Sequence, residues 1–241
     1  MTHWITADWP APANINAVTT LRTGGISQGE FSSLNPADHV NDKLQHVLEN
    51  RQRIKTMLAL PSDPVWLQQT HGIQAVCADR VTGIPEADAS YTAQSSVVCT
   101  VLTADCLPIL LCDLQGTSIA AIHGGWRGLL NGIIESTLCK MPRGEFMAWL
   151  GPAIGAQSFE VGDDVRNAFI DKSEQFGAAF KNHANGKYLA DIYQLARILL
   201  NNAGIRQIYG GQYCTVRESE RFFSYRRDGQ TGRMATMVWK T

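Results

Sequence analysis

Short apolar runs, each ended by a polar or glycine-rich turn, dominate the middle of the chain. Residues 97–102 and 108–112 are rich in Val, Ile and Leu and are too short for helices, which predicts two buried strands. A third strand is expected at residues 118–122, after the turn signal Gln115-Gly116. Reactive polar residues stand where these runs stop, so the pattern indicates that functional chemistry lies at strand ends.

Helical periodicity predicts most of the remaining structure. Apolar residues recur at helical spacing across residues 44–58 and 129–138, and the first of these helices ends before Pro61. Residues 191–203 form a clear amphipathic helix with Gly204 at its C-terminal cap. Helical structure is also expected to begin at residues 165–169. Further strands are predicted at residues 17–22, 65–69, 146–150, 207–209 and 234–239.

The order of these elements is not a regular alternation of strands and helices. It therefore predicts an α+β fold, a layered α/β sandwich with a mixed sheet, rather than a doubly wound parallel sheet. The sequence contains no internal repeat, low-complexity tract or linker composition. We accordingly expect residues 1–241 to form a single domain.

Composition narrows the classes of function. The chain has 241 residues, of which 44% are hydrophobic, and this is enough for a sizeable core. A net charge of −1 with no basic block gives no electrostatic reason to expect a nucleic-acid or membrane-surface partner. Apolar runs are shorter than the roughly 20 residues that span a bilayer. The first 15 residues lack the features of a signal peptide, so the expected location is cytoplasmic.

Six cysteines are present, and none forms a CxxC pair. In a reducing compartment most of them are expected to be buried small hydrophobes. Cys106 is the exception, because it lies between two predicted strands next to Asp105. For Asp105 itself, a role as general acid, general base or orienting partner stands beside the simpler role of a turn residue.

His71, Cys106 and His123 share one feature, since each lies at or just past the end of an apolar run. Two imidazoles and one thiolate form the kind of three-ligand set that catalytic zinc sites use, with a fourth position left open. The same set suits copper, although a blue-copper site favours an axial Met that the central stretch lacks. A Cys–His nucleophile pair and unrelated buried residues remain alternatives, because the spacing matches no compact zinc signature.

Arginines beside glycine turns and strand ends suggest an anion site. Arg22 precedes Gly24-Gly25, and Arg51 lies on the apolar face of the first predicted helix. Arg127 follows Gly124-Gly125 at an expected helix start, where backbone N–H groups can hold an anion. Arg226 and Arg227 follow Tyr225, which together with Phe223 is a candidate for stacking on a base. Each arginine has the alternative role of a structural ion-pair partner.

Ordered motifs along nearly the whole chain resemble one known family. The segments VWLQQTHG, TADCLPILL, AAIHGGWRG, WLGPAIG, FEVG and FFSYRRDG occur in this order, with RTGGIS and SLNPADHVND before them and TGRM after them. They are similar to the YfiH family, the bacterial relatives of the mammalian laccase-domain protein. That resemblance implies a layered α/β sandwich similar to the cysteine-hydrolase-like domain of a bacterial cytotoxic necrotizing factor.

The resemblance also implies a site and an activity. Family members carry a His-Cys-His metal site, which corresponds here to His71, Cys106 and His123. Activities assigned to the family include phosphorolysis of adenosine, inosine, guanosine and methylthioadenosine, and deamination of adenosine. Copper-dependent polyphenol oxidation and editing of a peptidoglycan precursor are also assigned to it. Asn35 belongs to a loop that reads SLNPA here and SLNLG in the family, so its substrate role carries over less directly.

Three classes of function follow from these observations. The first is a metal-dependent purine nucleoside enzyme, with a nucleoside and phosphate as ligands and Zn²⁺ as the expected metal. The second is a copper-dependent phenol oxidase, although six histidines are few for a multicopper cluster. The third is a hydrolase that acts on a UDP-muramoyl peptide, with Cys106 as nucleophile or ligand. Protein partners are not predicted.

Overall fold

Two packed sheets form the centre of the structure, a computed structural model that describes residues 2–241. The larger sheet has six strands, in the order β12-β8-β6-β7-β4-β3. Its outer pairs, β12 with β8 and β4 with β3, are parallel, whereas the inner pairs are antiparallel, so the sheet is mixed. Its strands are β12 (Gln207–Gly210), β8 (Phe146–Leu150), β6 (Leu107–Asp113), β7 (Ile119–Gly124), β4 (Ala89–Thr92) and β3 (Ala75–Cys77).

The second sheet is antiparallel throughout, with the strand order β1-β2-β13-β5. Chain segments from both ends meet in it, because β13 lies between β2 and β5. Its strands are β1 (Trp4–Thr6), β2 (Ile15–Thr20), β13 (Met234–Lys240) and β5 (Cys99–Thr103). A short third sheet, in the order β10-β11-β9, contains β10 (Phe180–Asn182), β11 (Tyr188–Ala190) and β9 (Glu160–Val161).

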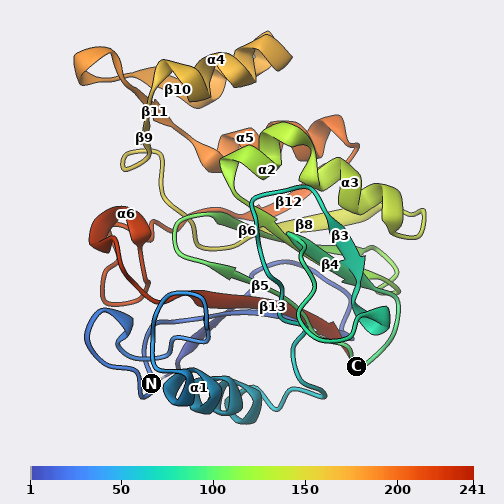
Figure 1. Ribbon diagram of the computed structural model, residues 1–241. Helices are drawn as coiled ribbons and strands as arrows, with labels where there is room; N and C mark the ends of the chain where they lie inside the picture. The colour runs from blue at the N-terminus through green and yellow to red at the C-terminus, as the bar shows by residue number, and fades with distance from the viewer. Residues whose placement is uncertain (1) are drawn as a thin grey trace.

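Helices cover the outer faces of the two main sheets (Figure 1). Along β6, Leu110 and Cys112 face the four-stranded sheet, whereas Ile109 and Leu111 belong to the core beneath the helices. This explains the uninterrupted apolar runs, since both faces of β6 are buried. The helices on that side are α2 (Trp126–Asn131), α3 (Ile133–Lys140) and α5 (Ile192–Asn202), whereas α1 (Leu44–Met57) lies under the four-stranded sheet.

The predicted α+β sandwich with a mixed sheet is therefore confirmed, with the layers arranged as helix, sheet, sheet and helices. The third sheet and α4 (Asp163–Lys172) extend beyond the α5 side of this sandwich (Figure 1). The remaining short helices are α6 (Tyr225–Asp228) and the 3-10 turns Gly29–Phe31, Ala78–Arg80, Glu174–Ala179 and Ala184–Gly186. No helix in residues 2–241 combines the length and apolar character that crossing a membrane needs.

Several local predictions are wrong for physical reasons. Residues 65–69 do not form a strand, because their backbone makes only isolated bridges at Val65 and Gln68. The helix predicted over residues 129–138 is two helices, because Gly132 adopts a left-handed conformation with φ of 99°. Leu44 and Leu48 fit the apolar pattern of α1 but are exposed. Of the six free cysteines, only Cys99 and Cys112 are buried.

A candidate metal and substrate site

The structure brings His71, Cys106 and His123 together at one end of the two main sheets. His123 is the penultimate residue of β7, and Cys106 lies in the short connection between β5 and β6. Asp105 turns this connection with a φ of 94°, and His71 has a φ of 60° in the loop before β3. Both φ values lie in the left-handed region, so the chain bends sharply at each point. These bends place the side chains of Cys106 and His71 beside His123.

The three side chains form a compact donor group. One potential ligand atom from each residue lies within 4.8 Å of the other two. Cys106 Sγ is 3.7 Å from His71 Nε2, and the two imidazole rings meet edge to face at 4.7 Å between centroids. In residues 2–241 this is the one such group of His, Cys, Asp or Glu side chains.

Asp88, fully buried just before β4, orients two of these residues. His123 Nδ1 donates a hydrogen bond to Asp88 Oδ1 at 2.7 Å, and the backbone N–H of His71 donates to the same oxygen at 3.0 Å. The backbone N–H groups of Thr70 and Gly72 donate to Asp88 Oδ2 at 3.1 and 2.7 Å. One carboxylate thus fixes the His71 turn and leaves His123 Nε2 free to face the thiol.

Charge coupling accompanies this geometry. Burial alone would raise the pKa of Cys106, but the charge and hydrogen bonds of His123 and His71 lower it to about 6. Burial would likewise lower the pKa of His123, but the Cys106 thiolate and Asp88 raise it to about 9. Burial also opposes ionisation of Asp88, yet its hydrogen bond to His123 and those from Gly72 and Thr70 hold its pKa below the usual value. The cysteine is therefore poised as a thiolate, the form that binds metals.

These residues fit a metal ion. Zinc bonds of about 2.0–2.3 Å in a tetrahedral arrangement would separate sulfur and nitrogen ligands by about 3.6 Å, close to the 3.7 Å between Cys106 and His71. An imidazole that donates its other N–H to a carboxylate, as His123 does to Asp88, is the usual arrangement for a metal-binding histidine. Two imidazoles and a thiolate suit zinc or copper, and both metals remain open at this point.

A cavity of about 440 Å³ opens onto this donor group. Its volume lies within the range of small-molecule sites, about 300–1,000 Å³. Apolar and aromatic side chains form much of its wall, among them Trp126, Ile154, Phe159 and Ile192. Polar side chains converge on the same space, which is the composition typical of a ligand pocket. Those polar and charged residues are His39, Gln69, His71, Thr103, Asp105, Cys106, His123, Arg127, Tyr225, Arg226 and Arg233.

Seven residues singled out from the sequence line the cavity: His71, Asp105, Cys106, His123, Arg127, Tyr225 and Arg226. The Asp105 carboxylate makes no hydrogen bond to His71, Cys106 or His123. Its carboxylate accepts hydrogen bonds from the Thr215 hydroxyl and the Arg226 backbone N–H, each at 2.6 Å. The Arg127 guanidinium stacks over the Trp126 ring at 4.3 Å. Arg127 is the second residue of α2, which is only six residues long. Aligned peptide dipoles in so short a helix add little to anion binding.

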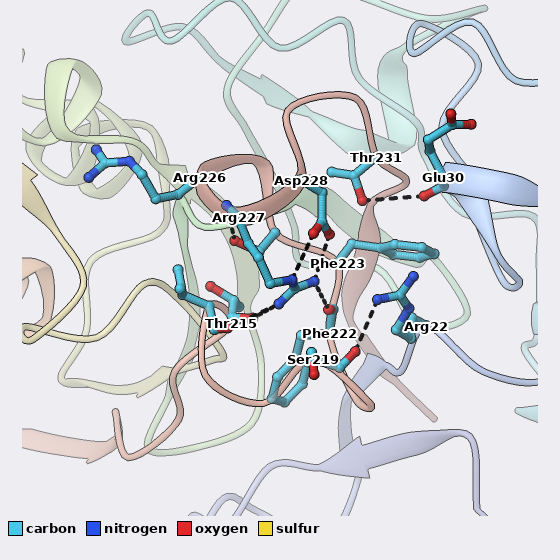
Figure 2. A network of polar contacts seen from close by, with 12 residues as sticks. Arg22, Glu30, Thr215, Ser219, Phe222, Phe223, Arg226, Arg227, Asp228 and Thr231 are labelled. Atoms are coloured by element: carbon cyan, nitrogen blue, oxygen red, sulfur yellow. Dashed lines mark hydrogen bonds and ion pairs between the residues drawn. The ribbon is translucent and has the colours of Figure 1, made fainter.

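Arg22, Asn35 and Arg51 do not line the cavity. Arg22 donates to the carbonyl oxygens of Ser32 and Ser219, and Arg51 donates to that of Pro36 and pairs with Asp38 at 3.1 Å. Figure 2 shows the Arg22 contact and also Arg227, whose guanidinium binds Asp228 and the carbonyl oxygens of Thr215 and Phe222. Asn35 is fully buried, with hydrogen bonds inside its own loop and one from the backbone N–H of Arg233. These side chains stabilise the loops behind the cavity wall.

Sequence reasoning did not assign roles to several residues that the structure brings to the site. Asp88 is one of them, and its link to His123 depends on the pairing of β4 with β7. Arg233 lies in the TGRM motif and His39 in the SLNPADHVND motif, and both line the cavity. Motif membership was the one available signal for these two residues, since neither follows a buried strand.

Comparisons with known proteins match nearly the whole chain. The sequence pattern described as "Multi-copper polyphenol oxidoreductase laccase" matches residues 16–241. YfiH of Escherichia coli, named a purine nucleoside phosphorylase, is 49% identical over 245 residues that cover 99% of each chain. A Pseudomonas aeruginosa protein, also named a purine nucleoside phosphorylase, is 48% identical over 242 residues, again with 99% of each chain covered.

Solved structures give the same result for the whole chain. A Neisseria meningitidis protein matches with a TM-score of 0.95 at 48% identity, covering 99% of each chain. YlmD of Geobacillus stearothermophilus matches with a TM-score of 0.88 at 30% identity, covering 99% of this chain and 96% of that one. The resemblance inferred from the ordered motifs is confirmed, and the chain belongs to the YfiH family of laccase-domain proteins.

Proposed function

We propose that this protein is a zinc-dependent purine nucleoside phosphorylase. The observation that carries the proposal is the cavity of about 440 Å³, whose wall combines the His71–Cys106–His123 group with apolar surface and three arginines. That combination suits a ligand with a flat base, a polar sugar and an anionic co-substrate. The names of the relatives from Escherichia coli and Pseudomonas aeruginosa support the same reaction class.

The donor group favours zinc over copper in this proposal. Two histidines and one thiolate leave a fourth position open, as catalytic zinc sites do. Zinc bound by these three residues would supply a Lewis acid beside the bound nucleoside. Copper clusters of the multicopper oxidases need more donor residues than the one group that residues 2–241 bring together.

The remaining wall provides for the base and the sugar. Phe159, Trp126 and Ile192 offer the apolar surface on which a purine can pack, and Tyr225, which is exposed, can cover it from the cavity mouth. Asp105 is held in place by Thr215 and Arg226. Each of its carboxylate oxygens keeps accepting capacity for a sugar hydroxyl, because a carboxylate has about four lone-pair sites.

The reaction assigned to this cavity is a balanced group transfer. An oxygen of hydrogen phosphate forms a bond to C1′ of the ribose, and the C1′–N9 bond breaks with its electron pair leaving on the purine. The purine nitrogen takes up one proton, which the proton lost by hydrogen phosphate balances. Arg127, Arg226 and Arg233 line the cavity and favour the approach of the phosphate dianion.

Phosphate dependence tests this function against its alternatives. Zinc-loaded protein is incubated with adenosine, inosine or methylthioadenosine, with and without phosphate, and the products are separated by chromatography. Phosphorolysis predicts free base and a sugar 1-phosphate only when phosphate is present. Deamination of adenosine gives inosine in both cases, and oxidation of a phenol requires dioxygen. Cleavage of a UDP-muramoyl peptide with intact nucleosides would identify a precursor-editing hydrolase instead.

Two variants connect any activity to this site. Cys106→Ala removes one donor of the group and should abolish both zinc binding and phosphorolysis. Cys139→Ala is the matched control, because Cys139 is an exposed free cysteine outside the cavity lining. Activity in Cys106→Ala equal to that in the control would refute the location of the reaction.

A further inference from the structure

Arg233 is a half-buried arginine of the cavity wall whose charge has no carboxylate partner among the described residues. Its guanidinium lines the cavity, and Nη1 donates to the carbonyl oxygens of Thr231 and Gly232 at 2.8 and 3.0 Å. In residues 2–241, no carboxylate lies within ion-pair distance of it, and neither Nε nor Nη2 makes a hydrogen bond. A largely buried cation with free donors is costly unless an anion binds beside it.

The other arginines near the site are already engaged. Arg226 donates through Nη1 to the carbonyl oxygens of Ser158 and Glu160, at 3.4 and 3.1 Å. Arg127 is exposed and stacks on its neighbour Trp126. Arg51 is paired with Asp38 behind the wall. Of the three cavity arginines, Arg127 and Arg226 are exposed, so Arg233 is the one whose charge is least compensated by solvent.

The backbone holds Arg233 at a defined position. Its N–H donates to Oδ1 of the fully buried Asn35 at 3.1 Å. The next residue, Met234, begins β13 and pairs with Thr103, which lines the same cavity. Because both contacts involve the backbone, a change of the Arg233 side chain leaves them in place. The guanidinium thus extends from a rigid base, which favours specific recognition of a planar or tetrahedral anion.

Charged and polar groups surround the part of the cavity between Arg233 and the His71–Cys106–His123 group. Burial lowers the pKa of the Arg233 guanidinium, and the nearby charges of Cys106 and Asp105 act in the opposite sense. Asp105 is hydrogen-bonded to the Thr215 hydroxyl and the Arg226 backbone N–H, and it makes no ion pair with Arg233. Thr103 also lines the cavity, and its buried hydroxyl has no hydrogen-bond partner. Exposed His39 adds a further polar group to the same wall.

From this arrangement we infer that Arg233, supported by Asn35, forms the subsite that holds free phosphate beside the His71–Cys106–His123 group. This inference rests on the proposed function, because phosphate is its co-substrate. It assigns phosphate to a residue that the sequence pattern did not single out. Arg22 and Arg51, which the pattern did suggest, stabilise the loops behind the wall, and Asn35 acts as a positioning residue.

Binding of inorganic phosphate tests the subsite separately from activity. Calorimetric titration of zinc-loaded protein with phosphate is compared among wild type, Arg233→Gln, Arg233→Lys and Arg206→Gln. Arg206 is the matched control, because it is exposed and lies outside the cavity lining. Loss of charge-assisted hydrogen bonds should weaken phosphate binding about tenfold or more in Arg233→Gln. Arg233→Lys keeps the charge but not the fork, and should lie between Arg233→Gln and wild type.

Kinetics separate the failure of this inference from the failure of the proposed function. If nucleosides are cleaved only with phosphate, Arg233→Gln should raise KM for phosphate about tenfold or more and leave KM for inosine within about twofold. Unchanged phosphate binding in a folded Arg233→Gln variant would overturn the subsite while phosphorolysis stands. Should Arg233→Gln not fold, the same criterion applies to Arg233→Lys. Wild-type protein that does not bind phosphate at all would also overturn it.

A final arm distinguishes free phosphate from the phosphate group of a nucleotide. Inosine 5′-monophosphate is titrated alongside inosine, with wild type and Arg233→Gln. Free phosphate as the natural ligand predicts that the nucleotide binds no more tightly than inosine. Binding of the nucleotide that is at least about tenfold tighter than that of inosine, and is lost in Arg233→Gln, would overturn the assignment to free phosphate.

Discussion

Replacement of Asp88 by Asn tests the origin of the site geometry. The Asp88 carboxylate accepts from four N–H donors, the backbone N–H groups of Thr70, His71 and Gly72 and His123 Nδ1, and from the Thr70 hydroxyl. Asparagine has the same shape but only one acceptor oxygen, so in either orientation of its amide two of these N–H donors face an NH₂ group. The variant therefore removes the orientation of His71 and His123 without creating a cavity.

The size of the effect follows from these contacts. Each buried donor left without an acceptor costs about 1–3 kcal/mol, so two of them should lower the free energy of unfolding by about 2–6 kcal/mol. Loss of the partner that orients a metal-binding histidine typically weakens metal affinity by about 10–100-fold. Both effects are expected together in Asp88→Asn.

Two measurements separate these effects. Urea unfolding is followed on metal-stripped protein, because bound metal adds its own stabilisation by mass action. Zinc affinity is measured by competition with a chelator under conditions where each variant is folded. Asp113→Asn is the matched control, since Asp113 is a buried carboxylate at the end of β6 that accepts from the N–H groups of Thr117 and Ser118.

The control should lose stability but keep its zinc affinity, because Asp113 lies at the far end of β6 from Cys106. If Asp88→Asn binds zinc as tightly as Asp113→Asn does, Asp88 does not orient metal ligands. If its free energy of unfolding equals that of wild type, the N–H hydrogen bonds to Asp88 do not have the value assigned to them.

Three further predictions concern the same site. A methyl group on Gly125 would come within 2.8 Å of the His71 ring and 3.4 Å of Cys106 Sγ, so Gly125→Ala should weaken zinc binding about tenfold. Gly177→Ala is the control, because Gly177 has open space around it, and it should leave zinc affinity unchanged. Equal zinc affinities of the two variants would contradict the close packing of Gly125. The rate at which iodoacetamide alkylates Cys106 in metal-stripped protein should rise with pH, with a midpoint near pH 6, the pKa of the thiol. A midpoint near pH 8.5, the pKa of a free cysteine, would contradict the coupling of Cys106 to His123. Because the pKa of Asp88 is lowered on folding, its stabilising effect is complete above about pH 3.9 and is lost as the pH falls below that value. Metal-stripped wild type should therefore lose more stability than Asp88→Asn between about pH 5 and pH 3. Equal acid sensitivity of the two proteins would contradict the lowered pKa of Asp88.

Much of the fold could be predicted from local pattern, because the buried strands read as apolar runs. The β6 strand was expected at residues 108–112 and spans Leu107–Asp113. Residues 65–69 read VWLQQ and also suggest a strand, but tertiary structure overrides this local pattern. The Gln69 side-chain amide donates to the Leu102 carbonyl and accepts from its N–H, and thereby occupies the pairing position that a strand would use. Such a contact depends on residues far apart in the sequence.

The site shows the same division between local and long-range information. His71, Cys106 and His123 could be selected because each stands where an apolar run stops, and the sheet then brings these ends together. The partner that orients His123 could not be chosen from sequence, since the pattern predicts strands beside Asp105 but does not predict β4, which follows Asp88. Their distinction arises from register, because His123 stands at the end of β7 that β4 and the preceding Asp88 meet. The roles of the individual residues stay predictions.

The fate of phosphate tests the central claim most directly. Zinc-loaded protein is mixed with inosine and phosphate in equal amounts, and ³¹P NMR follows phosphate while absorbance follows hypoxanthine. Phosphorolysis predicts that the inorganic phosphate signal is replaced by that of a phosphate monoester, one for each hypoxanthine released, and that Cys106→Ala shows neither change. Hypoxanthine released without loss of inorganic phosphate, or inosine left intact by fully zinc-loaded protein, would contradict the account.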